Sequence, residues 1–411
     1  MPEPTLEPKL TVWLGRRYPI EARWLEAESD NMHRRFVLAI LAASLVSRPG
    51  RVISGNNFLA AEEKSNGSRQ AGLAKEVRAK GWIVFSAQNA PGDWDLFLMR
   101  PDGSARRNIT NTADFHEAAA RFAPDGQRIL YYRIPRSSKL DNNTYGTFEL
   151  VIANSDGSNP TVYGKEYSWA SWGPKGETLS CLSKSGIQIV GVRTKKIVRV
   201  LDRKGIFEQL FSSPDGKWLC GTANGLGQHW TIARMESTTG ELNPVSDGSC
   251  YNCTPDWFPD STRIIFSKGI PCTLDYAQLW MANGDGSGRS LIYAESGRHI
   301  YGGMVSPDAQ YVLFTKSQQD LGKVDNSLTT MALMRLQDAP TIGGESLELR
   351  KLHPGSKDGP VLDLSLGWEP HWTYVELKEK VAANPDSKST KPKGQESEQI
   401  GRPTRNPASS R

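Results

Sequence analysis

Residues 116–133 read HEAAARFAPDGQRILYYR, and this stretch decides the fold. An apolar segment (118–123) leads into a Pro-Asp-Gly turn (124–126), and a second apolar segment (129–132) follows directly. Proline presets the backbone angle φ of a turn, while Asp and Gly supply a local hydrogen bond and a permissive backbone. The stretch therefore predicts two β-strands joined by a tight turn.

The same unit recurs along the chain, and each copy aligns on the proline of its turn. Each turn is followed by a short run that is apolar on both faces, then by a third and a more polar fourth strand. The prolines are spaced by 40 to 50 residues, as is typical of propeller blades, and four short strands per unit make one blade. The aligned prolines are Pro124, Pro174, Pro214, Pro259 and Pro307.

The two ends of the repeat region are incomplete in complementary ways. Residues 82–108 supply second, third and fourth strands without a first one, whereas residues 368–374 supply a first strand with nothing after it. Pairing these ends would complete a sixth blade and remove exposed sheet edges. We therefore predict an all-β fold, a six-bladed β-propeller over residues 81–374, with the ring closed by N- and C-terminal strands in one shared blade.

These repeats resemble those of the TolB-like six-bladed β-propellers, periplasmic relatives of WD-repeat proteins. The resemblance covers residues 81–374 and implies a fold rather than an activity, since propellers host many functions. TolB itself carries a separate α/β domain before its propeller. Because only residues 48–80 lie between the apolar segment and the first strand, we expect that domain to be missing here.

The N-terminal region has the pattern of an export signal. Basic residues after Met32 precede a short apolar run (36–46), so residues 32–47 are predicted to be a signal peptide or membrane anchor. The polar residues 1–31 are then an extension before the true start at Met32, and residues 48–80 a linker. These features predict a periplasmic or secreted protein in the bacterial envelope, with membrane contact only through the N-terminal segment.

Charge is unevenly distributed along the chain, whose formal net charge is +5. The repeat region holds 29 basic and 31 acidic residues and therefore has no bulk positive field. A nucleic-acid partner is not expected without that electrostatic footprint. The basic C-terminal residues 375–411 contain few apolar side chains and are predicted to be a disordered tail.

The five cysteines are candidates for disulfides, because an exported protein meets oxidising conditions. Either member of the Cys-Tyr-Asn-Cys pair could bond the cysteine of the following long loop. That pair also has the spacing of a redox or half-zinc motif, although no second pair accompanies it. The cysteines are Cys181, Cys220, Cys250, Cys253 and Cys272.

Propeller geometry places the Pro-Asp-Gly turns on one face and the longer loops on the other. The loop face carries more polar and aromatic side chains, so we predict that it is the functional surface. Its candidate ligand-binding residues are His116, Glu117, His229, Tyr276, His299, Tyr301, Asp325 and His371.

Two functions remain open from the sequence. No nucleophile elbow, P-loop or HExxH motif is present, which favours a non-catalytic scaffold for an envelope protein, peptide or glycan, with no cofactor. The alternative is a polysaccharide lyase or hydrolase with a divalent metal in the central channel, held by His116, His299 and His371. Oligogalacturonate-lyase-like propellers, which bind a metal through channel histidines, suggest this alternative by resemblance.

Overall fold

The structure, a computed structural model, describes part of the chain, and all of it belongs to one compact unit, Gly55–Arg411. The predicted extension (1–31), the predicted signal segment (32–47) and nearly all of the predicted tail lie outside the described residues. No helix within the described part has the length and apolar character needed to cross a membrane. The described residues are 67–90, 92–138, 148–269, 276–295, 297–320, 323–324, 328–339 and 361–377.

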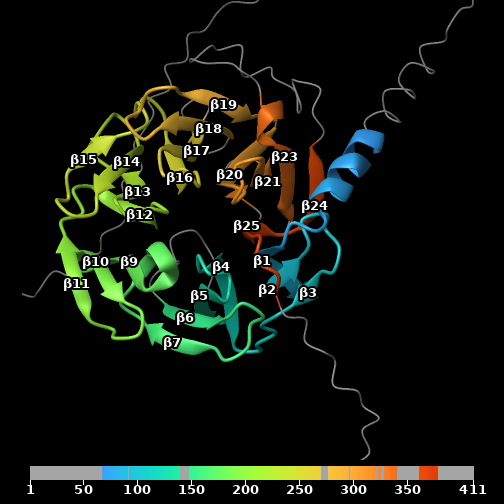
Figure 1. The fold of residues 1–411 in the computed structure, drawn as a ribbon, viewed down its shortest axis with the longest axis horizontal. Helices are drawn as coiled ribbons and strands as arrows, with labels where there is room; N and C mark the ends of the chain where they lie inside the picture. The colour runs from blue at the N-terminus through green and yellow to red at the C-terminus, as the bar shows by residue number, and fades with distance from the viewer. Residues whose placement is uncertain are drawn as a thin grey trace, which may run out of the picture. The chain divides into compact units, whose positions relative to one another are not determined.

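The described part is mainly β-structure, as predicted, and its sheets are arranged around a common centre (Figure 1). Four sheets have four strands each. The first contains β25 (Trp368–Thr373), β1 (Trp82–Ala90), β2 (Asp93–Met99) and β3 (Arg107–Asn108). The second contains β4 (Phe115–Phe122), β5 (Arg128–Pro135), β6 (Glu149–Asn154) and β7 (Thr161–Gly164). The third contains β8 (Ser168–Trp172), β9 (Thr178–Ser183), β10 (Gly186–Gly191) and β11 (Ile197–Leu201). The fourth contains β12 (Ile206–Ser212), β13 (Trp218–Ala223), β14 (Thr231–Glu236) and β15 (Leu242–Pro244).

A fifth sheet has nine strands, so the strands are not divided into six separate sheets as the blade count predicted. Its two halves are joined by a parallel contact between β18 and β20 at one residue pair, Ala277 and His299. Its strands are β16 (Asn252–Trp257), β17 (Arg263–Gly269), β18 (Ala277–Asn283), β19 (Ser290–Tyr293), β20 (Arg298–Val305), β21 (Tyr311–Asp320), β22 (Lys323–Val324), β23 (Thr330–Arg335) and β24 (Leu362–Leu366).

The two ends of the repeat region pair as the sequence predicted. Strand β25 runs antiparallel to β1, with Trp82 opposite Thr373 and Val84 opposite His371. The core then lies between neighbouring sheets: Trp82 of β1 packs with Phe122 of β4 in one buried cluster. Packing on both faces explains why the strands after each turn are apolar throughout.

The innermost strand of each strand set carries the same irregularity. Strands β4, β8, β12, β16, β20 and β25 each show a break in register with the neighbouring strand. A residue with positive φ lies at each break, and a β-bulge of this kind bends the strand and re-aims the side chains that follow. These bulge residues are Ala119, Trp169, Gln209, Thr254, Gly302 and Glu369.

Part of the predicted linker is ordered. Residues 67–77 form a helix beside β24, and its Leu73 and Val77 are fully buried in a cluster with Trp372 (Figure 1). Glu76 forms an ion pair of 2.5 Å with Arg335. This segment of the predicted linker is therefore helical, and the spacing of its two apolar residues suits one face of a helix.

Leu73→Ala is expected to lower the free energy of unfolding by about 2 kcal/mol, towards the lower end for a buried leucine. This helix packs beside the sheets and can detach instead of retaining a cavity, which limits the loss. Urea unfolding of the variant measures the effect. Lys75→Ala changes an exposed position of the same helix and should leave stability nearly unchanged. An equal loss in both variants would contradict specific docking through Leu73.

Candidate functional site

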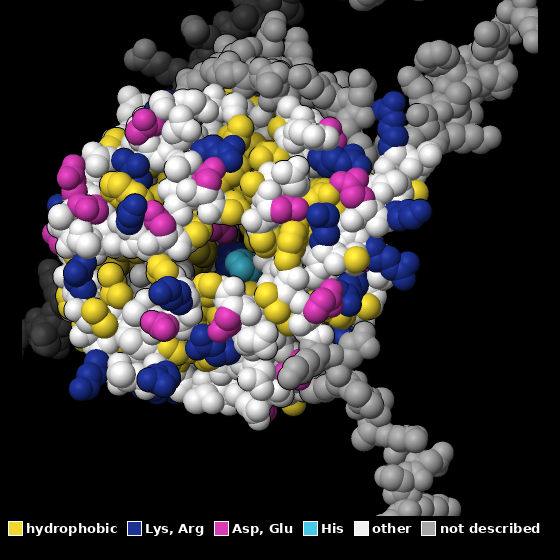
Figure 2. Space-filling view, viewed as in Figure 1, with side chains coloured by type: hydrophobic (Ala, Val, Ile, Leu, Met, Phe, Trp, Pro, Cys, Tyr) yellow, Lys and Arg dark blue, Asp and Glu magenta, His cyan; other side chains and the backbone are white. Residues whose placement is uncertain are grey.

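A hollow near the centre lies on the side of the proline turns. It has a volume of about 330 Å³ and is lined by all five aligned turn prolines and by the ends of the innermost strands. Figure 2 shows a central hollow with apolar side chains around it and a histidine inside. We refer to this hollow as the turn-side cavity. Its volume suits a ligand of small-molecule size or a short segment of a larger one.

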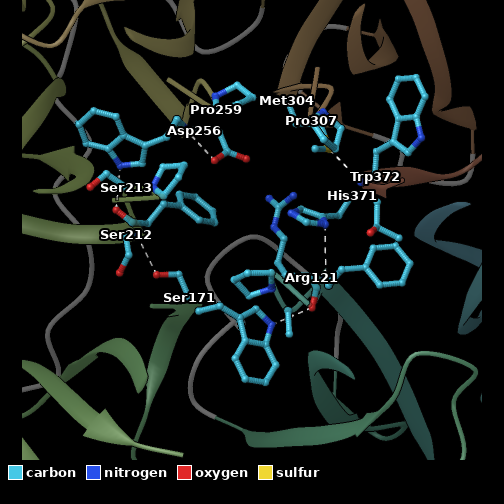
Figure 3. A pocket seen from close by; sticks show the side chains of 18 of the residues that line it. Arg121, Ser171, Ser212, Ser213, Asp256, Pro259, Met304, Pro307, His371 and Trp372 are labelled. Carbon is cyan, nitrogen blue, oxygen red and sulfur yellow. Dashed lines mark hydrogen bonds between the residues drawn. The ribbon is translucent and has the colours of Figure 1, made fainter. Parts of the chain in front are cut away.

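Six side chains reach the turn-side cavity from equivalent positions, each two residues beyond a bulge residue (Figure 3). The bulge turns this position towards the centre, so one residue per innermost strand contributes to the wall. The set combines one cation, one carboxylate, one imidazole, one hydroxyl and two apolar groups. These residues are Arg121, Ser171, Phe211, Asp256, Met304 and His371.

Hydrogen bonds between neighbouring sheets hold this wall in place. The indole Nε1 of Trp172 donates to the carbonyl oxygen of Arg121 at 3.0 Å. In the same way, Nε1 of Trp257 donates to the carbonyl oxygen of Phe211 at 3.1 Å. Each tryptophan is buried and follows the cavity position of its own strand by one residue. These hydrogen bonds therefore fix the strand part of the cavity wall between neighbouring sheets.

Arg121 is the only cationic side chain among the cavity-lining residues. Its Nη1 donates to the carbonyl oxygen of Pro370 at 3.3 Å, and its guanidinium lies 5.0 Å from the centre of the Phe211 ring. Among the described residues it forms no ion pair. Because a guanidinium offers five N–H donors, Arg121 keeps donors available for a ligand.

The other titratable groups near Arg121 are shifted towards their neutral forms. Burial raises the pKa of Asp256, and the charge of Arg121 opposes that shift. Burial also raises the pKa of Glu369 to about 7. His371 accepts a hydrogen bond at Nδ1 from the backbone N–H of Phe122 at 3.2 Å. Burial and Arg121 hold the pKa of His371 well below its usual value, so it is neutral at pH 7 with its proton on Nε2.

Further from the proline turns, the central space inside the ring of strands narrows. A second cavity of only about 30 Å³ is lined by all six bulge residues, and Arg121 and Phe211 line both cavities. Hydrogen bonds tie the bulges together: the amide oxygen of Gln209 accepts from the backbone N–H of Thr254 at 2.7 Å. A space of this size holds about one water molecule, so the bulges form the floor of the turn-side cavity.

The turn-side cavity lies on the face opposite to the predicted functional surface. Of the predicted candidates, only His371 lines the turn-side cavity. His116 is buried in β4, where its Nδ1 accepts the backbone N–H of Trp94 at 3.4 Å. Glu117 is fully buried and accepts a 2.5 Å hydrogen bond from the hydroxyl of Thr112. Both side chains point into the protein because their strand continues further than the loop prediction assumed.

The remaining candidates lie outside the turn-side cavity. The His229 ring lies 4.5 Å from that of Tyr251, and the His299 ring lies 5.3 Å from that of Tyr301. Tyr301 is itself buried, whereas Tyr276 is 40% exposed. The first of these contacts lies between residues outside the strands, and the second lies within β20. Asp325 lies outside the described residues.

The three histidines proposed as metal ligands are not brought together. His116, His299 and His371 make separate contacts from β4, β20 and β25. Nowhere in the described part of the chain do three His, Cys, Asp or Glu side chains gather closely enough to hold a metal ion. The described residues therefore do not fit the metal site expected for the alternative function.

The cysteines divide into two groups. Cys250 is disulfide-bonded, which agrees with the expectation for that pair of residues. Cys181, Cys220 and Cys253 are free thiols, so a bond between Cys181 and Cys220 is not formed. Burial raises the pKa of Cys253 to about 12, which keeps it protonated and argues against a redox role for the Cys-Tyr-Asn-Cys pair. Cys272 lies outside the described residues.

The sequence reasoning missed Arg121 and Asp256, although the sequence holds a signal for them. Aligning the repeats on the turn proline places a wall residue three positions earlier in five of the units. Reading down that column would have placed Arg121 and Asp256 among the side chains that face the centre. The five residues of the column are Arg121, Ser171, Phe211, Asp256 and Met304.

Comparison with known proteins gives a fold and no closer relative. No protein-family model matches the sequence, and no curated protein matches it. Among solved structures, TolB from Acinetobacter baumannii is similar at a TM-score of 0.51 and 16% identity, over 76% of this chain and 72% of that one. A putative TolB from Agrobacterium tumefaciens has a TM-score of 0.33 at 16% identity, over 63% and 78% of the two chains.

An oligogalacturonate lyase from Vibrio parahaemolyticus has a TM-score of 0.38 at 13% identity, over 62% of this chain and 68% of that one. Identities this low bear on architecture and not on activity. The repeated strand–turn–strand units, the sheets around one centre and the similarity to the first of these structures agree with one another. This chain therefore has a TolB-like β-propeller fold.

Proposed function

We propose that the protein is a non-catalytic binding propeller of the bacterial envelope that holds a segment of a protein, peptide or glycan partner in the turn-side cavity. The observation that carries this proposal is Arg121, a cation without an ion pair among the described residues, set in a rigid wall beside Phe211 and Asp256. Apolar walls with a few convergent polar groups are typical of binding sites.

The proposal includes a complete ring of six blades. Its support is the six equivalent bulged strands and the pairing of β25 with β1, with the nine-stranded sheet counted as two blades joined at one residue pair. It also includes export through residues 32–47, for which the support is the basic residues followed by an apolar run. The alternative, a metal-dependent lyase or hydrolase, gains no support from the described histidines.

Photo-crosslinking tests the choice of face. A photoreactive side chain at Pro307, which is exposed at the turn-side cavity, is expected to capture the partner in cells. The same side chain at Tyr276, exposed beside the loop between β17 and β18, is the matched control. Capture from Tyr276 and not from Pro307 would contradict binding in the turn-side cavity and would place the binding surface on the loop face.

Arg121→Ala is expected to reduce that capture roughly 10-fold, because a hydrogen bond to a charged group contributes about 1.5 kcal/mol or more. Arg121→Lys should recover part of the loss, since it keeps the charge but not the planar set of donors. The yield of the Pro307 crosslink measures both variants, and urea unfolding checks that each remains folded. Unchanged capture with Arg121→Ala would remove Arg121 from the site.

A further inference from the structure

The outer edge of the third sheet is unusual among the described surfaces. Strand β11 pairs with β10 and is the last strand of its sheet, on the outer rim of the ring (Figure 1). Its Ile197, Val198 and Val200 are 52%, 65% and 48% exposed. They make up three of the seven large apolar side chains that are exposed in the described residues. Apolar exposure concentrated on one strand indicates a contact surface.

The same segment is strongly basic. Residues 193–204 contain six basic side chains and one acidic one, in a repeat region whose total charge is slightly negative. None of the six forms an ion pair within the described part of the chain; Lys195 and Arg199 instead donate to the carbonyl oxygens of Tyr163 and Ser237. We call this segment, with its exposed apolar residues, the basic edge. Its cations are Arg193, Lys195, Lys196, Arg199, Arg203 and Lys204.

An added β-strand from a partner is a poor occupant for the basic edge. The ladder between β10 and β11 breaks beside Val198: Arg199 pairs with Ile189, and Ile197 pairs with Val190. A bulge interrupts the row of backbone groups that an added strand needs, and lysines on an edge also oppose strand addition. An occupant that needs no regular edge is therefore favoured.

Charge and apolar exposure together select among such occupants. A soluble polyanion would neutralise the lysines and arginines but would leave Ile197, Val198 and Val200 in water. An anionic lipid bilayer offers negative headgroups to the cations and acyl-chain surface to the apolar side chains. A bilayer is also broad enough to meet all of these residues at once.

We propose that the basic edge docks on the surface of an anionic lipid bilayer, as a membrane contact separate from the predicted N-terminal segment. The headgroups would contact the six cations while Ile197, Val198 and Val200 enter the boundary between headgroups and acyl chains. Such docking would fix the orientation of the ring relative to the membrane. It makes no use of the turn-side cavity and does not depend on the proposed function.

Amide hydrogen exchange of the full chain tests this contact locally. It reports protection of the basic edge separately from any membrane binding by the N-terminal segment. The probe is vesicles of phosphatidylglycerol and phosphatidylcholine in equal parts, with pure phosphatidylcholine vesicles for comparison. Peptides covering residues 193–204 should exchange more slowly with the anionic vesicles, and added salt should reverse the effect because it screens surface charge.

A matched pair of variants checks the chemistry. Lys196→Glu with Val198→Ser is expected to weaken docking about 30-fold or more. The change from lysine to glutamate alters the charge at the anionic surface by two units, each of which contributes about 1 kcal/mol. Lys75→Glu with Leu366→Ser makes the same kinds of change at an exposed lysine and a 52% exposed leucine elsewhere, and should leave docking unchanged. All these positions are exposed, and urea unfolding confirms that both variants fold.

Three results would overturn the proposal. The first is unchanged exchange of residues 193–204 in wild-type protein with anionic vesicles. The second is equal protection by the phosphatidylcholine vesicles, which would exclude charge recognition. The third is protection that depends on protein concentration without vesicles, which would assign the basic edge to a second copy of this chain.

Discussion

Glu117→Gln is expected to raise the free energy of unfolding by roughly 4 kcal/mol near pH 8 and by much less near pH 4. Glu117 is fully buried, and its neighbour Asp95, also fully buried, receives a hydrogen bond of 2.6 Å from Asn108. Burial, with a smaller contribution from the nearby charge of Asp95, raises the pKa of Glu117 to about 8, although the hydrogen bond from Thr112 opposes the shift. Two adjacent buried carboxyl groups therefore share an environment that favours one negative charge.

The direction of the pH effect follows from the raised pKa. In the unfolded chain Glu117 ionises near pH 4.5, whereas in the folded protein it holds its proton until about pH 8. As pH rises through this window the unfolded state gains charge first, so the wild type loses stability. The amide of Gln accepts from Thr112 and donates to Asp95 as a protonated carboxyl would, but it cannot ionise.

Urea unfolding of both proteins across this pH range measures the effect. Burial also raises the pKa of Glu208 to about 7, so the pH dependence of wild-type stability contains contributions from several groups. The difference in free energy of unfolding between wild type and Glu117→Gln isolates the contribution of Glu117. Glu149→Gln is the opposite control, because hydrogen bonds from Arg133 hold the pKa of Glu149 low and its contribution is lost as pH falls. A Glu117→Gln difference that does not grow with pH would show that the pKa of Glu117 is not raised in the folded protein.

The sequence predicts the strand order well because the repeated turn sets the register of every unit. A Pro-Asp-Gly turn needs no tertiary partner, so its positions are readable from local chemistry. The pairing of residues 368–374 with residues 82–90 was also predictable, since each end lacked what the other supplied. The joining of two strand sets through Ala277 and His299 rests on one residue pair, and no sequence pattern marks it.

The cavity was harder to predict than the fold. Its residues belong to strands, so in sequence Phe211 and Met304 resemble core residues, while polar loops elsewhere resemble a binding surface. The bulges that aim these side chains inward have positive φ at residues such as Trp169 and Gln209. Tryptophan and glutamine rarely adopt positive φ, so the sequence does not indicate these bulges. Only alignment of the repeats, or the three-dimensional structure, brings Arg121 and Asp256 to one site.

Trp372→Ala is expected to lower the free energy of unfolding by about 4 kcal/mol, in the upper range for core substitutions. The side chain is 2% exposed, and its ring lies 5.8 Å from that of Tyr311. Its indole Nε1 donates to the carbonyl oxygen of Lys80 at 2.6 Å, so the variant also leaves that carbonyl without its partner. Trp372→Phe keeps most of the apolar contact and should cost about half as much.

The position of Trp372 makes a second, more selective outcome expected. It packs in one cluster with Leu73 of the 67–77 helix and with Ile83 of β1, at the place where the two ends of the repeat region meet. Trp372→Ala should therefore speed amide exchange in residues 67–77 under native conditions, because the helix loses its contact surface. Trp172→Ala removes a tryptophan from the equivalent position of β8, with a similar hydrogen bond to Arg121, and should destabilise the protein without this local effect. If both variants opened the helix equally, the junction would have no special role; if neither did, the helix would be held by the Glu76–Arg335 ion pair and not by apolar packing.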